Sequence, residues 1–115
     1  MITLYGISNC DTVKKARRWL DEHGVPFQFH DFRNDGLELA TLLDWLKLTD
    51  WESLLNRRST TWRELSAPDK AVQGQTAALQ LMLQHPTLIK RPVLATGAHL
   101  LVGFKPEYYH EMLHR

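Results

Sequence analysis

The chain has 115 residues, of which 43% are hydrophobic and 23% are charged, and its formal net charge is +1. These values predict one globular domain, 1–115, and exclude a disordered or fibrous chain. The small net charge gives no general reason to expect nucleic acid as a direct partner. No apolar run approaches the roughly 20 residues of a membrane span, and the first residues lack a signal-peptide pattern. We therefore expect a cytoplasmic protein without a membrane partner.

The N-terminal third is predicted to form a strand, a helix and a second strand. Residues 2–5 alternate apolar and polar side chains, as a half-buried strand does. Residues 11–23 carry apolar side chains at helical spacing, and Gly24 ends that pattern. Alternation returns over 27–30. A helix that connects two strands favours their parallel pairing.

The middle of the chain, about 37–86, is predicted to be a mainly helical insertion. A turn at 34–36 precedes it. Its expected elements, in order, are a helix over 37–48, a short helix opened by a capping box of Thr61 and Glu64, a break over 66–69, and a helix over 75–84 that Pro86 ends.

The C-terminal part is predicted to form a hairpin and a last helix. Two apolar runs, 92–95 and 99–102, flank a connection that contains Gly97. Pro106 then suits the first position of a helix. The complete order is βαβ, then helices, then ββα. This order predicts an α/β, thioredoxin-like fold with a mixed four-stranded sheet and a helical insertion.

Cys10 is the only cysteine, and it lies between the first predicted strand and the first predicted helix. Backbone N–H groups at a helix start lack intrahelical partners and carry partial positive charge. A thiol at this position is therefore biased toward the reactive thiolate. Asp11 acts in the opposite direction on the thiolate, because its carboxylate is negative. We predict that Cys10 is a catalytic thiol and include its polar neighbour Asn9 in the binding site.

A second thiol is absent from the position where dithiol reductases carry one. The residue three positions beyond Cys10 is Val13. A mixed disulfide formed at Cys10 must then be released by an external thiolate, and glutathione is the obvious small donor. The sequence thus predicts no bound cofactor, glutathione as co-substrate, and glutaredoxin as a possible partner.

Arg91 and Pro92 form the second informative pair. An X-Pro bond adopts the cis form at modest cost, and in thioredoxin-type folds a cis proline faces the active thiol. The guanidinium of Arg91 could bind an oxyanion or a glutathione carboxylate, or it could be a surface residue at a strand entrance. The sequence alone leaves both the isomer and this choice open.

Histidines and tryptophans give weaker signals. The six histidines show no spacing typical of metal ligands, so we expect no metal. The four tryptophans are expected to fill or cover the core rather than to stack on nucleic acid.

Three segments together resemble the ArsC/Spx family, most closely its YffB-like branch. They are Tyr5-Gly6-Ile7-Ser8-Asn9-Cys10-Asp11-Thr12-Val13-Lys14-Lys15-Ala16, Arg58-Ser59-Thr60-Thr61-Trp62-Arg63, and His85-Pro86-Thr87-Leu88-Ile89-Lys90-Arg91-Pro92-Val93. The resemblance covers nearly the whole chain. It implies a thioredoxin-like fold with a helical insertion and a nucleophilic Cys10.

The resemblance also implies an arginine-lined site, from which this chain departs. Arsenate reductases of the family use three arginines beside the cysteine, of which one corresponds to Arg91. Asn56 stands at the position of a second, directly before Arg57 and Arg58. No arginine occurs at 103–105, the region of the third, and Gly6 replaces a histidine that precedes the cysteine. These departures count against arsenate, because a tetrahedral oxyanion needs several convergent donors.

We therefore predict a single-cysteine, glutathione-dependent thiol/disulfide reductase. Its site residues would be Cys10, with Asn9, Arg57, Arg58, Arg91 and Pro92 binding a small thiol, disulfide or oxyanion substrate. Two alternatives remain open. One is an arsenate reductase that uses glutathione and glutaredoxin. The other is an Spx-like adaptor that binds RNA polymerase.

Overall fold

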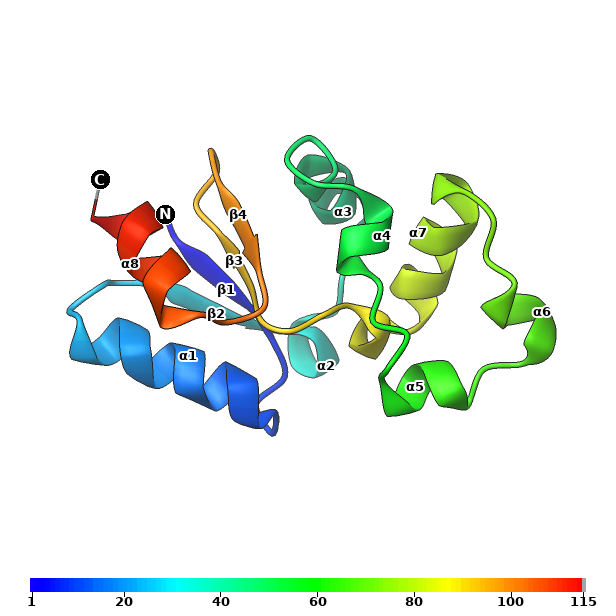
Figure 1. Cartoon of the computed structure of the whole chain (residues 1–115), viewed down its shortest axis with the longest axis horizontal. Coiled ribbons are helices and arrows are strands. Elements are labelled where there is room, and N and C mark those ends of the chain that lie inside the picture. Colours follow the sequence, from blue (N-terminus) through cyan, green and yellow to red (C-terminus); the bar gives the residue numbers. More distant parts are fainter. Residues whose placement is uncertain (115) are drawn as a thin grey trace. The chain divides into compact units, whose positions relative to one another are not determined.

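A computed structural model describes residues 1–114, which form two compact units. The first unit contains 1–35 and the residues from 91 onward, and the second contains 36–90. The elements of Figure 1 are, in order, β1 (Thr3–Gly6), α1 (Asp11–Glu22), β2 (Gln28–Asp31), α2 (Phe32–Asp35), α3 (Leu39–Trp45), α4 (Trp51–Leu54), α5 (Thr60–Arg63), α6 (Ala67–Lys70), α7 (Gln75–Gln84), a 3₁₀ turn η1 (Pro86–Leu88), β3 (Val93–Ala95), β4 (Leu100–Val102) and α8 (Pro106–Leu113).

The first unit is built on a four-stranded mixed sheet with strand order β2-β1-β3-β4. β1 pairs in parallel with β2, as a helical crossover requires, and antiparallel with β3, which forms a hairpin with β4. This βαβ and ββα arrangement is the predicted thioredoxin-like fold. The prediction of fold class is confirmed.

The strand register brings four chain segments to one end of this sheet. Gly6 lies opposite Asp31 at the end of β2, and Tyr5 lies opposite Val93 at the start of β3. Val93 in turn lies opposite Val102 at the end of β4. We call this the Cys10 end of the sheet, because the connection from β1 to Cys10 leaves from it.

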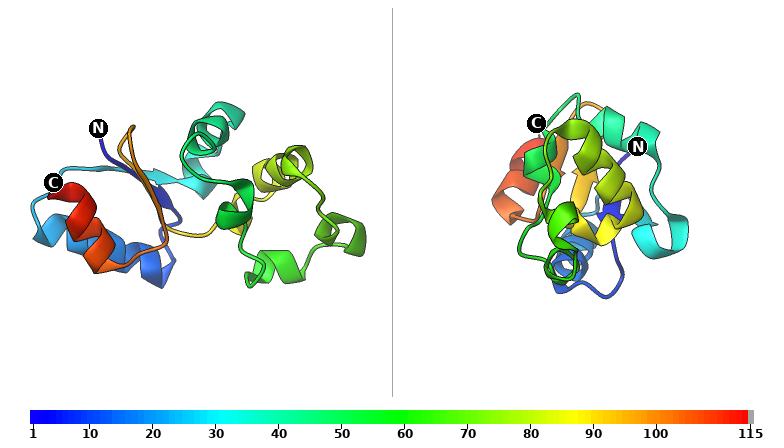
Figure 2. Two further views of the ribbon diagram at one scale, coloured as in Figure 1. Left: turned by 45° about the horizontal axis from the view of Figure 1, so that its top comes forward. Right: turned by 90° about the vertical axis from the view of Figure 1, so that its right-hand side faces the viewer.

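Helices α1 and α8 cover one face of the sheet. Leu4 of β1 and Leu94 of β3 are neighbours in the register, so their side chains share a face. Both belong to a buried cluster with Ala16 and Leu20 of α1 and with Tyr109 of α8. Figure 2 shows the two helices side by side. The apolar face of α1 predicted from the sequence is therefore the face that builds this core.

The close approach of β1 to α1 depends on Gly6. A Cβ atom added at Gly6 would lie 2.7 Å from Cγ2 of Val13, which is fully buried in the first turn of α1. Real Cβ atoms essentially never come so close to another heavy atom. Gly6 is thus required by packing, because no side chain fits there unless Val13 moves.

The second unit is helical, as predicted for the insertion. α7 packs against α3 and α4 and carries four buried residues, Ala78, Leu79, Leu81 and Met82. An isolated antiparallel bridge joins Leu55 to Ile89 beside this packing. Within residues 1–114, no helix is both long and apolar enough to cross a membrane.

Side-chain caps explain three one-turn helices of the second unit. The carboxylate of Asp50 accepts a hydrogen bond from the backbone N–H of Ser53 at 2.7 Å, and this bond lowers the pKa of Asp50. The hydroxyl oxygens of Ser59 and Ser66 accept bonds from the N–H groups three residues later. Each cap satisfies a donor that a four-residue helix leaves without an internal partner.

Several predicted elements were wrong in detail. Ser59, not Thr61, caps the short helix, and the Thr61 hydroxyl instead shares a 2.6 Å hydrogen bond with the hydroxyl of Thr87. The expected break over 66–69 is the capped helix α6, whose Pro68 occupies an early helical position that needs no N–H donor. The helix expected over 37–48 is regular only over Leu39–Trp45, and α2 and α4 were not predicted.

Tyr109 carries the one buried side-chain oxygen or nitrogen without a hydrogen-bond partner in the described part of the chain. Its ring makes edge contacts with Trp19 and Phe104, with centroid distances of 5.7 and 4.9 Å. Its burial raises the pKa of the Tyr109 hydroxyl well above the usual value of 10.0. The ring stabilises the core, whereas the hydroxyl loses its hydration.

Replacing Tyr109 by Phe removes this hydroxyl and keeps the ring. We expect the free energy of unfolding, measured with urea, to stay the same or to rise by up to about 1 kcal/mol. Tyr108→Phe is the matched control, because Tyr108 is 52% exposed. If Tyr109→Phe lowers the free energy of unfolding by more than about 1 kcal/mol, the Tyr109 hydroxyl must make a stabilising hydrogen bond, which would contradict its description as unpartnered.

Tyr109→Phe should also change how the free energy of unfolding depends on pH under alkaline conditions. Above pH 10.0 the unfolded chain ionises Tyr109 while the folded chain does not, so stability falls as the pH rises. Tyr109→Phe removes this contribution, and its stability should decline less steeply above that pH.

A double-mutant cycle tests the contact between Gly6 and Val13. Gly6→Ala should destabilise the protein by about 1–3 kcal/mol through overpacking, and Val13→Ala should destabilise it by about 2 kcal/mol through lost burial. The double variant should be at least about 1 kcal/mol more stable than the sum predicts, because the smaller side chain at 13 makes room for the new methyl group. Additive losses would show that the two residues are not in contact.

Candidate active site at the Cys10 end of the sheet

Cys10 is the N-terminal cap residue of the twelve-residue helix α1. Its backbone is extended, with φ −94° and ψ 125°, and its carbonyl oxygen accepts the first helical hydrogen bond from Lys14. Its own N–H donates to the carbonyl of Ile7 at 3.3 Å, which closes the turn after β1. The thiol is partly exposed and makes no capping hydrogen bond. Cys10 therefore lies where an incoming molecule can reach it, beside the positive end of a helix.

The residues that precede Cys10 give the loop its shape. Ile7 is buried and anchors the loop, while Ser8 and Asn9 are exposed. Asn9 was predicted to bind substrate, and its place beside the thiol is compatible with that role. The buried Val13 occupies the position where a resolving cysteine would stand in a dithiol enzyme.

Arg91 and Pro92 lie at the same end of the sheet. Their peptide bond is cis, which settles the isomer that the sequence left open. Extending the pairing of Tyr5 with Val93 by one residue places Pro92 opposite Gly6, at the start of the loop that leads to Cys10. Pro92 is fully buried, whereas Arg91 is half-buried. The fold thus brings the predicted thiol and the predicted arginine–proline pair to one end of the first unit.

The third segment at this end is the connection from β4 to α8. The N–H of Gly103 donates to the carbonyl of Pro92 at 2.8 Å, so this connection is tied directly to the proline. Gly103 has a φ of +86°, a conformation that suits glycine. Lys105 follows it as the cap residue of α8. The sole cation of this segment, 103–105, is therefore a lysine.

The fourth segment contains Asp31, which the sequence reasoning missed. Asp31 is only 6% exposed, lies opposite Gly6, and accepts a hydrogen bond from the N–H of Arg33 at 2.8 Å. Its own N–H donates to the carboxylate of Asp35. An aspartate that follows an alternating strand and precedes a helix is a typical helix-start signal, and that pattern could have revealed it. Its bonds hold β2 to α2 at the Cys10 end.

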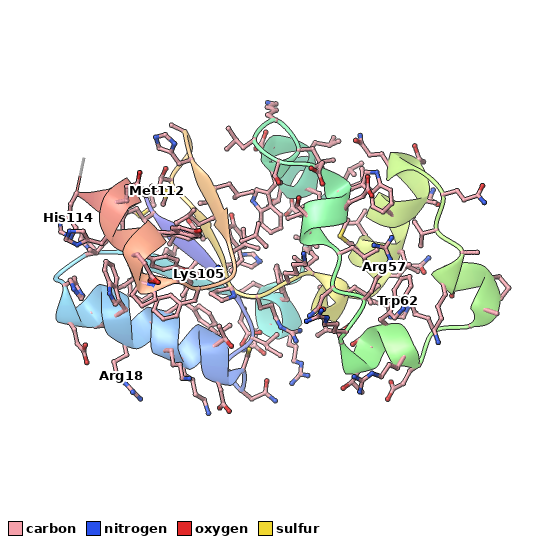
Figure 3. The ribbon with its side chains drawn as sticks, in the orientation of Figure 1. Arg18, Arg57, Trp62, Lys105, Met112 and His114 are labelled. Atoms are coloured by element: carbon pink, nitrogen blue, oxygen red, sulfur yellow. The ribbon has the colours of Figure 1, made fainter. Side chains whose placement is uncertain are left out.

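Arg57 and Arg58 belong to the second unit. Hydrogen bonds from the N–H groups of Arg58 and Ser59 to Asn56 form a tight turn, and both arginine side chains are exposed. The guanidinium carbon of Arg57 lies 5.6 Å from the ring centre of Trp62. Both side chains are labelled in Figure 3. The structure thus shows how the second unit presents these arginines, and their role at Cys10 stays a prediction.

No metal site is evident in residues 1–114, since no three His, Cys, Asp or Glu side chains come together there. The chemistry available at this end of the sheet is that of one accessible thiol, an adjacent helix terminus and a guanidinium. Such a set suits nucleophilic attack by sulfur on an electrophile with a negative group nearby.

Comparison with known proteins agrees with the fold. The model of the ArsC family matches residues 5–112. The solved structure of a protein named YFFB has a TM-score of 0.92 and 47% identity, covering 96% of this chain and 97% of the other. An arsenate reductase-related protein from Brucella melitensis has a TM-score of 0.75 and 46% identity, covering 97% and 93%.

A regulator is also among the relatives. The global transcriptional regulator Spx of Listeria innocua is 27% identical over 117 residues, covering 100% of this chain and 88% of that protein. The family model spans all the segments that carry the site, from Tyr5 to Met112. The chain belongs to the ArsC family.

Proposed function

We propose that the protein is a single-cysteine thiol/disulfide reductase that uses glutathione as its reducing co-substrate. The observation that carries this proposal is the accessible Cys10 at the start of α1, on the same end of the sheet as the cis Arg91–Pro92 pair. Membership of the ArsC family supports sulfur chemistry as the class of reaction. We expect glutathione because Val13 stands where a second thiol would be, so that an external thiol must release the product.

The first chemical step is an exchange at sulfur. The Cys10 thiolate attacks the glutathione sulfur of a glutathionylated thiol, which forms a Cys10–glutathione disulfide and breaks the original S–S bond. The leaving thiolate takes up a proton from water. Cys10 lies at the start of α1, where the helix dipole places partial positive charge.

The second step needs a thiol from outside the protein. Val13 is a buried aliphatic residue at the position of a resolving thiol, so the first unit cannot close an internal disulfide there. A second glutathione thiolate attacks the glutathione sulfur of the mixed disulfide, and Cys10 leaves as thiolate. The net reaction converts one glutathionylated thiol and one glutathione into a free thiol and glutathione disulfide.

Arg91 is proposed to bind a carboxylate of the glutathione portion. A guanidinium offers paired donors to a carboxylate, and its place before the cis proline puts it at the end of the sheet that carries the thiol. We assign Asn9 to the same binding site, and Arg57 or Arg58 to a second anionic group. Glutaredoxin would be an alternative donor of the resolving thiol.

Arsenate is a less favourable substrate for this site. A tetrahedral oxyanion calls for several convergent donors, whereas the connection after β4 offers Lys105 as its only cation. Gly6 stands where the resemblance places a histidine, and Val13 fills the space that its side chain would need. A thiol or disulfide with one anionic group needs fewer convergent donors than arsenate does.

Incubation with glutathione disulfide and intact mass measurement test this proposal. We expect one glutathione adduct on the wild-type protein, its removal by excess glutathione, and no adduct on Cys10→Ser. Arg91→Ala should slow adduct formation about tenfold through the loss of a charge-assisted hydrogen bond. Lys90→Ala is the matched control, because Lys90 is an exposed cation next in sequence.

Two outcomes would contradict the proposal. A wild-type Cys10 that gains no adduct and is alkylated no faster than a free thiol would show that it is not a nucleophile. Equal slowing of adduct formation by Arg91→Ala and Lys90→Ala would show that Arg91 contributes only positive charge and does not bind a carboxylate of glutathione directly.

The Spx relative supports a second candidate, an adaptor that binds RNA polymerase. The match covers all of this chain and 88% of the Spx protein. Pull-down from lysate with wild type and Cys10→Ser distinguishes the candidates. The reductase proposal predicts no retention of polymerase by either protein, and equal retention by both, with no thiol chemistry, would favour the adaptor.

A further inference from the structure

Beyond its first turn, which begins with Asp11, the charges of α1 run against the preference of the helix itself. Basic residues follow Asp11 through the first half and middle of the helix, and acidic residues occupy its last turn, which has no basic residue: Lys14, Lys15, Arg17, Arg18, Asp21 and Glu22. The helix dipole favours the opposite order, with cations near the C-terminus. Helix stability therefore does not explain these cations, which give the exposed side of α1 a positive surface.

Three of these cations form a stripe that begins one turn after Cys10. Lys14, Arg17 and Arg18 follow Cys10 at spacings of four, seven and eight residues, which place them along one side of the helix. They line a shallow depression of about 370 Å³ together with Asp21 and Glu22. We call Lys14, Arg17 and Arg18 the α1 basic stripe.

The cations of the stripe are available for a ligand. Among the residues that the structure describes, none of the three forms an ion pair within 4.0 Å, although acidic residues follow one turn later. Arg17 is held in place, because its guanidinium carbon lies 4.2 Å from the ring centre of Phe29. Lys14 and Arg18 are exposed, and Figure 3 shows Arg18 pointing away from the helix.

We propose that the α1 basic stripe docks an acidic polypeptide segment whose disulfide reacts at Cys10. This inference rests on the proposed thiol chemistry and adds a class of substrate, acidic proteins, that the chemistry does not specify. The partner presents a negative strand to a positive stripe that leads away from the thiol. Complementary charge of this kind raises the association rate and selects partners.

The length of the stripe sets where the acidic residues must lie. Arg18 is about 12 Å beyond Cys10 along the helix axis, which corresponds to about three to four residues of extended chain. Asp21 and Glu22 follow at about 17 Å and repel negative charge. The partner should therefore carry Glu or Asp three or four residues from its reacting cysteine, and not five or six.

A nucleic acid fits this surface less well than a polypeptide does. A phosphate backbone carries charge without interruption, so a strand placed along the stripe would run onto Asp21 and Glu22. The reaction at Cys10 also requires sulfur in the bound molecule.

Peptide disulfides provide a direct test. Each probe is a peptide with one cysteine joined to 2-thiopyridine. The Cys10 thiolate attacks the peptide sulfur, a peptide–Cys10 disulfide forms, and the leaving thiolate takes up a proton to give pyridine-2-thione, which is measured by absorbance. The first peptide carries Glu three and four residues from the cysteine on both sides. The second carries Glu five and six residues away, and the third carries Lys three and four residues away. A pyridyl disulfide of 2-mercaptoethanol is the neutral reference.

At low ionic strength we expect the peptide with near Glu residues to react fastest. Arg18→Gln should slow that peptide about two- to fivefold and leave the neutral reference unchanged. Lys47→Gln is the matched control, because Lys47 is an exposed cation of the second unit, outside α1, and its removal should not affect the preference. At about 1 M salt, where the Debye length is about 3 Å, the preference should vanish.

Equal rates for the near-Glu and near-Lys peptides would overturn the docking proposal while leaving the thiol chemistry intact. Equal effects of Arg18→Gln and Lys47→Gln would overturn it as well, since net charge alone would then explain the preference. Absence of reaction with the neutral reference would refute the proposed thiol chemistry and the docking proposal together.

Discussion

The pairing of β1 with its two neighbours is the constraint on which the site depends. Because β1 runs parallel to β2 and antiparallel to β3, the end of β1, the end of β2 and the start of β3 meet at one place. The β3–β4 hairpin adds the connection to α8 at the same end. Cys10 and the Arg91–Pro92 pair are about eighty residues apart in sequence, and the register alone brings their segments together. A shift of one residue would turn every core side chain of β1 to the other face.

Packing at the first turn of α1 adds a second constraint, on chemistry rather than on topology. Gly6 and Val13 lie so close that neither can be enlarged without displacing the other. Gly6 stands where the resemblance places a histidine, and Val13 stands where a dithiol reductase carries its second thiol. A redox cycle that begins at Cys10 must then end on an external thiol, and we propose that the α1 basic stripe selects the partner of this cycle by charge.

Much of the fold was predictable because its signals are local. Alternation over β1 and β2, the apolar face of α1 and the Pro-initiated α8 are properties of neighbouring residues. The predictions of the short helices were wrong because their caps depend on contacts between distant residues. Thr61 matches a capping pattern, but its hydroxyl bonds to Thr87, which lies 26 residues away, and Ser59 caps instead. The cis state of Pro92, the burial of Asp31 and the Gly6–Val13 contact likewise arise only after distant segments pack.

The central claim is our proposal that Cys10 is a nucleophile and that Arg91 favours its reaction with negatively charged molecules. Its most direct test is the ratio of the alkylation rates of Cys10 with iodoacetate, which is negative, and with iodoacetamide, which is neutral. The account predicts a ratio above that of a free thiol in the wild-type protein, and a lower ratio in Arg91→Ala but not in Lys90→Ala. A wild-type ratio equal to that of a free thiol, unchanged by Arg91→Ala, would contradict the account.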